Sequence, residues 1–83
     1  MSFHLSIVTP SGKVFDEPVD SVAAAGLMGG FEVYTGHMPM LAALKPGPAK
    51  VRHQGKESVF NIDSGILEVD AAHNVLILAD QIL

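Results

Sequence analysis

The spacing of glycine and proline constrains this sequence more than any other feature. Eight Gly and five Pro residues interrupt the 83-residue chain, and before residue 65 no uninterrupted stretch exceeds nine residues. Such stretches are short for an ordinary helix but suit strands of about five to seven residues. The spacing therefore predicts short strands joined by tight turns, and it leaves room for a helix only after Gly65.

Apolar and polar residues alternate within these stretches, as they do in strands that bury one face. Strand-like segments cover residues 3–7, 14–15, 19–24, 31–34, 40–44, 49–53, 58–62, 66–69 and 75–79. Pro18 is expected to end the second segment, and Gln54-Gly55-Lys56 to form the clearest hairpin turn. Residues 75–79 are apolar on both faces, which is typical of a central strand whose outer face lies under a neighbour or partner. Eight to ten such strands predict one antiparallel all-β sandwich over residues 1–83, with a small barrel as the alternative.

Composition excludes several classes of protein. Cysteine is absent, so disulfides, thiolate catalysis and Cys-based zinc sites are excluded. A hydrophobic fraction of 48% supports a real core, and a net charge of −4 argues against broad binding to nucleic acid. No apolar run reaches the roughly 18–20 residues of a membrane span, and the first residues lack the features of a signal peptide. These features predict a soluble, cytosolic single domain.

The four histidines do not have the spacing of a metal site. None of them form the i, i+2 or i, i+4 pairs typical of zinc ligands, so no metal is predicted. For His4, His53 and His73 we expect surface or turn positions. His37 lies in Gly36-His37-Met38-Pro39, a conformationally special loop of the kind that carries function. Contact or packing is favoured there over acid/base catalysis.

Other candidate sites have simple structural explanations. Asp16, Glu17 and Asp20 are interpreted as a solvated acidic edge. The glycine-rich segment Gly26–Gly30 precedes a strand and lacks the Lys-Ser/Thr of a phosphate loop, which favours a turn with positive φ. No serine lies in a nucleophile elbow. The residues therefore predict no catalytic site and no cofactor.

Two features favour binding. Four of the five basic residues fall in one twelve-residue window: Lys45, Lys50, Arg52 and Lys56. Three of the four methionines flank the special loop, where filling the core is favoured over a contact surface: Met28, Met38 and Met40. From the residues alone the chain is a β-sheet binding or scaffolding module, either part of an assembly or a free-standing module for a small ligand or protein partner.

Three phrases resemble one known family. Residues 3–15, Phe3-His4-Leu5-Ser6-Ile7-Val8-Thr9-Pro10-Ser11-Gly12-Lys13-Val14-Phe15, are similar to the opening strands of the epsilon subunit of F-type ATP synthase. Residues 34–47 resemble that family's P-G-H-x-P-L-L-x-x-L-K-P-G phrase. Residues 64–69 and 75–80 resemble G-G-x-L-E-V…V-x-V-L-A-D. All three occur in the family's order and spacing, from about residue 3 to residue 80.

The resemblance implies a role as well as a fold. It implies a sandwich of about ten strands at the foot of the rotating central stalk, with no chemistry and no cofactor of its own. The implied partners are the gamma subunit and the polar loops of the membrane c-ring, which couple proton flow to ATP synthesis. Association with the cytoplasmic face of the bacterial plasma membrane would occur only through the complex, and the isolated chain is expected to be a monomer.

The resemblance also implies contact residues. The expected gamma contacts are Thr9, Met40, Leu41 and Ala42. The expected c-ring surface is a loop from Gly29 to Pro39, with contacts at Gly30, Glu32 and His37.

The sequence departs from the family at three places. Position 30 commonly carries an acid but is Gly30 here, so Glu32 or His37 is the expected substitute. Thr35 replaces a proline, which should loosen the loop. Two regulatory C-terminal helices usually follow where this chain has Gln81-Ile82-Leu83, so neither ATP binding nor inhibition by that hairpin is expected of the chain.

Overall fold

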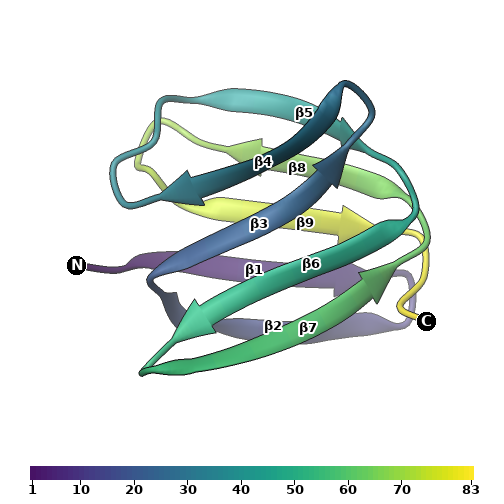
Figure 1. Cartoon of the computed structure of the whole chain (residues 1–83), viewed down its shortest axis with the longest axis horizontal. Helices are drawn as coiled ribbons and strands as arrows, with labels where there is room; N and C mark the ends of the chain where they lie inside the picture. Colours follow the sequence, from purple (N-terminus) through teal and green to yellow (C-terminus); the bar gives the residue numbers. More distant parts are fainter.

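Nine β-strands make up the chain in the computed structural model, which describes all residues 1–83 (Figure 1). The strands are β1 (Phe3–Thr9), β2 (Gly12–Val19), β3 (Ser21–Gly26), β4 (Gly29–Tyr34), β5 (Met40–Leu44), β6 (Gly47–His53), β7 (Lys56–Ile62), β8 (Gly65–Val69) and β9 (Val75–Ala79). No helix is long and apolar enough to cross a membrane.

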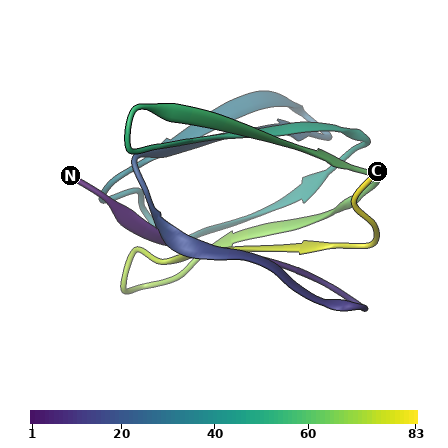
Figure 2. The same cartoon turned by 90° about the horizontal axis from the view of Figure 1, so that it is seen from below.

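The strands form two layers packed face to face (Figure 2). One layer, sheet one, has the order β4-β3-β6-β7, and the other, sheet two, has the order β2-β1-β9-β8-β5. A single residue pair, Gly26 with Leu44, joins β3 to β5 at one corner. The predicted all-β sandwich is confirmed. The strand number is nine rather than ten, since the segment after β9 contributes only one isolated bridge, from Ile82 to Ile62.

One strand pair departs from the predicted antiparallel pattern. β1 and β9 run parallel, with Leu5 opposite Val75 and Ile7 opposite Ile77. Parallel neighbours need a long crossover connection, and here most of the chain lies between the two strands. β9 lies between β1 and β8, which confirms the prediction that its apolar sequence marks a central strand.

Side chains alternate between the two faces of each strand, and those that point inward form the hydrophobic core. Sixteen buried apolar residues form one cluster between the layers. The fully buried ones include Leu5, Ile7, Leu67 and Ile77 from sheet two and Val22, Val33 and Val51 from sheet one. Each such side chain contributes about 1.5–3 kcal/mol relative to exposure. Because side chains alternate along a strand, the residues that lie between these core positions in sequence face outward. They form the two outer surfaces of the sandwich.

The second strand is longer than its sequence predicts. Pro18 was expected to end it, but β2 continues through Pro18 to Val19, which is buried. β2 pairs only with β1 and is an edge strand, which tolerates proline because some of its N–H groups point to solvent and not to a neighbouring strand. The next strand accordingly begins at Ser21 rather than at Val19.

The two predicted turns differ in outcome. Gln54 and Gly55 have φ values of 53° and 73°, and they connect β6 and β7 as the predicted hairpin. The strand expected over residues 31–34 is confirmed and begins earlier, at Gly29. The loop expected from Gly29 to Pro39 is therefore wrong over its first half, where β4 pairs with β3 along its length. Within β4, Val33 is buried and Phe31 packs against the core, which holds the segment in the sheet. Only residues 35–39 remain as a turn.

Candidate interaction surfaces

The three predicted c-ring residues lie along one free edge of the sandwich. β4 pairs with β3 alone, so its other side is open. Gly30 lies near the β3–β4 turn, and Glu32 is exposed in the middle of the strand opposite Ala23. His37 follows the strand, in the 35–39 turn at the other end. The structure therefore places the three along a single line, and not on one projecting loop tip.

His37 is held by its own turn. Its backbone N–H donates to the Tyr34 carbonyl at 3.3 Å, and its ring Nδ1 lies 2.7 Å from the Met38 carbonyl. Because a carbonyl can only accept, Nδ1 carries the proton. The His37 carbonyl in turn accepts a hydrogen bond from Nδ1 of His73 at 3.0 Å. The ring thus contacts a main-chain oxygen through Nδ1.

The sequence did not predict that the turn carrying His73 lies against the candidate c-ring surface. It connects β8 to β9, and Asp70 organises it: its Oδ1 accepts from the backbone N–H groups of Ala72 and Asn74, both at 2.9 Å. His73 adopts φ of +67°, a left-handed conformation. An aspartate followed by Asn74 between two apolar segments is a turn signal that could have located it. The expectation of a turn position for His73 is confirmed.

The predicted gamma residues occupy two different environments. The Thr9 hydroxyl donates to the Gly12 carbonyl and accepts from Ser11 N–H, both at 3.2 Å, and so closes the β1–β2 turn. On β5, Met40 and Ala42 lie opposite the buried Val69 and Leu67 and share their inward face.

Leu41 lies between Met40 and Ala42 and faces the other way. It is opposite the exposed Glu68, and 71% of its side chain is exposed. Strand alternation therefore separates Leu41 from its two neighbours. Of the three β5 candidates, only Leu41 stands on the outer face of sheet two.

The outer face of sheet two carries an apolar row that begins two residues along β5 from Leu41. Pairing aligns Ala43, Ile66, Leu78 and Val8 across four neighbouring strands. Ile66 is 42% exposed and Leu78 49% exposed. A groove beside the row is lined by Thr9 and Pro10 together with Val8, Ile66 and Leu78. Contiguous exposed apolar residues on a folded domain mark a contact surface. The apolar outer side of residues 75–79 was the sequence signal for it.

The family described as ATP synthase, Delta/Epsilon chain, beta-sandwich domain matches residues 2–83. The chain belongs to this family. It is 38% identical over 82 residues to the ATP synthase epsilon chain 1 of Thiobacillus denitrificans, covering 96% of this chain and 57% of that protein. It is 40% identical over 80 residues to the ATP synthase epsilon chain of Anaeromyxobacter sp. strain K, covering 96% and 60%.

Solved structures of ATP synthases share the fold. A chain in the Euglena gracilis mitochondrial ATP synthase, OSCP/F1/c-ring, superposes with a TM-score of 0.92 at 23% identity, covering 99% of this chain and 52% of that one. A chain in the Tetrahymena thermophila mitochondrial ATP synthase, central stalk and c-ring, gives 0.87 at 17% identity, covering 100% and 66%. The chain spans a little over half the length of the curated relatives that it matches.

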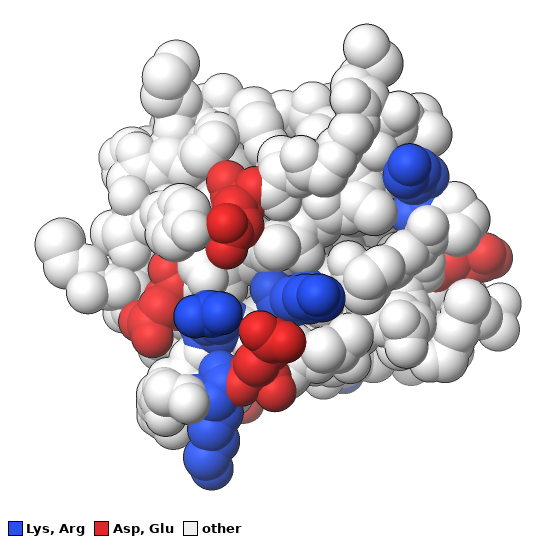
Figure 3. All heavy atoms as spheres, viewed as in Figure 1, with Lys and Arg blue, Asp and Glu red and all other residues white.

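In this member of the epsilon family the outer face of sheet one is charged. Figure 3 shows Lys and Arg side chains next to Asp and Glu side chains in the lower part of that face. Lys50 and Arg52 project outward from β6, and Arg52 Nε lies 3.7 Å from Glu57 Oε1. The neighbouring Glu32 carboxylate raises the pKa of Tyr34. Acidic side chains therefore partly neutralise the basic window on this face.

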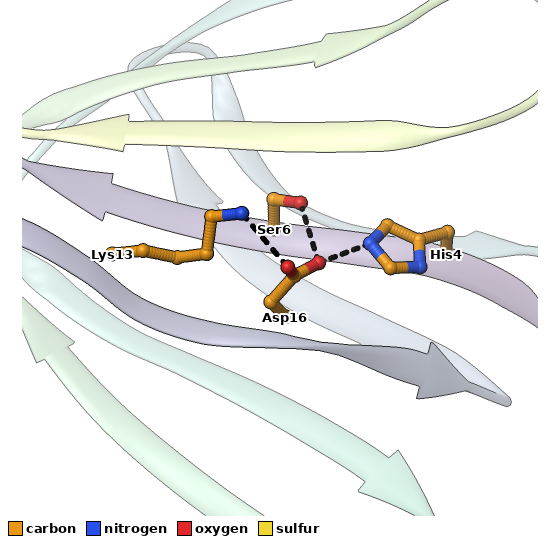
Figure 4. A network of polar contacts seen from close by, with 4 residues as sticks. All are labelled: His4, Ser6, Lys13 and Asp16. Carbon is orange, nitrogen blue, oxygen red and sulfur yellow. Dashed lines mark hydrogen bonds and ion pairs between the residues drawn. The ribbon is translucent and has the colours of Figure 1, made fainter.

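Asp16, which the sequence analysis placed in a solvated acidic edge, lies in a network of polar contacts on β2. Asp16 accepts from Lys13 Nζ at 2.8 Å, from His4 Nε2 and from Ser6 Oγ at 3.2 Å (Figure 4). The Lys13 and His4 contacts lower the pKa of Asp16 to about 2. The network joins edge strand β2 to β1. The structure brings together no group of three or more His, Asp or Glu side chains in a metal-ligating arrangement.

Two expectations about individual side chains are wrong. His53 was expected at the surface, but only 15% of its side chain is exposed. It packs edge-on against Phe15 at 5.5 Å between ring centroids and lies 3.2 Å from the Ser58 hydroxyl. Its residue faces inward because β6 alternation places it in register with the buried Val51 and Ala49. Met28 and Met38 were expected in the core, yet both lie in turns and are exposed.

Proposed function

We propose that this chain is a non-catalytic central-stalk subunit of a proton-translocating F-type ATP synthase at the cytoplasmic face of a bacterial plasma membrane. In this proposal it links the gamma subunit to the c-ring and so helps couple proton flow to ATP synthesis. Support comes from its bacterial relatives, which are named ATP synthase epsilon chains and are 38–40% identical to it. Because the match covers only part of those proteins, the role of the whole subunit is inferred here.

The gamma contact is assigned to the outer face of sheet two. The single observation that carries this assignment is the exposed apolar row beside Leu41, on a domain whose core is already complete without it. Burial of such a row against a partner contributes about 25 cal/mol per Å² of apolar area. Thr9 lies at the end of this surface. Met40 and Ala42 face the interior of the sandwich, so in this proposal Leu41 makes the outer-face contact on β5 and these two do not.

The c-ring contact is assigned to the β4 edge and the 35–39 turn. Glu32 has an exposed carboxylate there. The His37 ring is already hydrogen-bonded through Nδ1, and Gly30 leaves the backbone without a side chain. A negative charge at such an edge complements a basic partner loop. An exposed ion pair of this kind contributes about 0–1 kcal/mol, so one substitution should weaken coupling without preventing assembly.

The alternative of a free-standing small-ligand module has less support. Ligand sites are concave and largely enclosed. The hollows on this domain are shallow and open, such as the one over Ala23, Ala25 and Gly30 on sheet one. An extended apolar face suits a protein partner better.

Binding to the cognate gamma subunit tests the proposal. Leu41→Asp should weaken binding at least tenfold, because it places a charge in a desolvated contact. Val59→Asp is the control, since Val59 is also an exposed apolar residue, at 49% exposure, but lies on sheet one. Circular dichroism should show both variants folded. Equal affinity of the two variants for gamma would contradict the assignment of this face.

A further inference from the structure

Two turns far apart in the sequence meet at one end of the sandwich. The 35–39 turn follows β4 and the 70–74 turn connects β8 to β9, and both lie at the N-terminal end of the molecule in Figure 1. One hydrogen bond joins them: the His73 ring donates from Nδ1 to the His37 carbonyl at 3.0 Å across 36 positions of sequence. It ties the β4–β5 connection, which passes from sheet one to sheet two, to the β8–β9 turn of sheet two.

The 70–74 turn is rigid enough to act as the anchor. Four hydrogen bonds close it: two to Asp70 Oδ1, one from Asp70 N–H to the Asn74 carbonyl at 2.9 Å and one from His73 N–H to the Asp70 carbonyl at 3.0 Å. These bonds hold His73 at φ of +67°, where a non-glycine residue is uncommon. A strained conformation of this kind persists only where the surroundings over-determine it.

Strand pairing holds both ends of the 35–39 turn, but few hydrogen bonds hold the residues between them. Gly36, Met38 and Pro39 are exposed, and Thr35 and His37 are half-buried. Inside the turn, the His37 N–H bond to Tyr34 is long at 3.3 Å, and the His37 ring bond ends on the adjacent residue. The contact with His73 is therefore the hydrogen bond that ties the middle of this turn to the 70–74 turn.

We propose that His73 is a positioning residue that fixes the 35–39 turn, and with it the direction of His37, through a hydrogen bond to the His37 main chain. The bond requires the Nδ1–H form of the His73 ring, because the partner is a carbonyl that can only accept. The bond itself follows from the geometry of this chain. Its consequence for the c-ring contact rests on the function proposed above.

Three substitutions of His73 distinguish the effect of losing the hydrogen bond from the effect of relieving the left-handed backbone. Asparagine tolerates a left-handed backbone, and its Nδ2 is attached to Cγ as Nδ1 of histidine is, so His73→Asn should keep the bond. Aspartate has the same shape without a donor, so His73→Asp should lose it. His73→Gly relieves the backbone and also loses the bond.

Amide hydrogen exchange in the full chain, followed by NMR, measures the effect. The His37 amide should exchange about fivefold faster in His73→Asp and His73→Gly than in the parent, and at the parental rate in His73→Asn. Gln54→Gly is the control, because it relieves a left-handed residue (φ 53°) in a remote hairpin and should leave His37 exchange unchanged. Ring ¹⁵N shifts of the parent should show His73 protonated at Nδ1. Equal His37 exchange in the Asn, Asp and Gly variants would overturn the proposal.

A second arm in the assembled ATP synthase separates this inference from the proposed function. His37→Cys keeps the carbonyl that His73 contacts, so its crosslinking to the c-ring loop can be compared with and without the hydrogen bond. Adding His73→Asp should lower the crosslinking yield several-fold, and adding His73→Asn should not. If exchange responds as predicted but position 37 never crosslinks to the c-ring, the c-ring assignment is wrong and the positioning role of His73 stands.

Discussion

A side chain at position 65 would place its Cβ 2.2 Å from the carbonyl oxygen of Leu78. Gly65 begins β8 opposite Ala79 of β9, and the two backbones approach there more closely than any Cβ permits. The partner atom belongs to the main chain, so it cannot move aside without disturbing the pairing of the central strand β9.

Gly65→Ala should therefore lower the free energy of unfolding by about 3 kcal/mol, the upper range for overpacking. Denaturant unfolding measures the change. Gly30→Ala is the matched control in β4, because its new Cβ would meet only Ala24 O, at an ordinary 3.7 Å. That substitution should change stability by less than about 1 kcal/mol. Equal effects of the two substitutions would contradict the geometry of the β8–β9 pair.

The two faces of β9 should respond differently to truncation. Ile77 is fully buried and Leu78, its neighbour, faces outward. Ile77→Ala should cost about 2–5 kcal/mol of unfolding free energy, through lost burial and a residual cavity. Leu78→Ala should cost less than about 1 kcal/mol but weaken binding to gamma. Denaturant titration and a binding assay on the same two variants check this, and a stability loss at Leu78 as large as at Ile77 would contradict the outward assignment.

Acid should weaken the edge of sheet two through Asp16. The Lys13 and His4 contacts lower its pKa from 3.8 to about 2 in the folded chain. Because the folded pKa lies below the unfolded one, the carboxylate stabilises the fold above about pH 4, and this contribution is lost as the pH falls from about 4 to about 2. Unfolding free energies of the parent and Asp16→Asn, measured from pH 2 to pH 5, should differ at pH 5 and converge toward pH 2. Curves that stay parallel over this range would show that Asp16 makes no such contribution.

Local signals predicted much of this fold from the sequence. The β6–β7 hairpin followed from alternation around Gln54-Gly55, since a two-residue turn fixes its own register. The central position of β9 followed from its apolar faces. The parallel pairing of β1 with β9 could not be predicted in this way, because nothing in either segment encodes a partner some seventy residues distant.

The candidate site was harder to predict for the same physical reason. Gly29, Gly30 and Gly36 suggested one loop, but burial of Phe31 and Val33 holds residues 29–34 in the sheet. Met40, Leu41 and Ala42 were taken together, although strand alternation turns only Leu41 outward. The contact of His73 with His37 depends on tertiary structure and has no sequence pattern of its own.

Cysteine crosslinking in the assembled ATP synthase tests the central claim most directly. Leu41→Cys should crosslink to gamma, and Glu32→Cys or His37→Cys to the c-ring loop. Gly30→Cys provides a further position along the same β4 edge. Lys56→Cys, in the β6–β7 hairpin at the opposite edge of the sandwich, should crosslink to neither partner. Crosslinks to the c-ring from position 56, with none from 30, 32 or 37, would mean that the domain sits the other way up and would contradict the account.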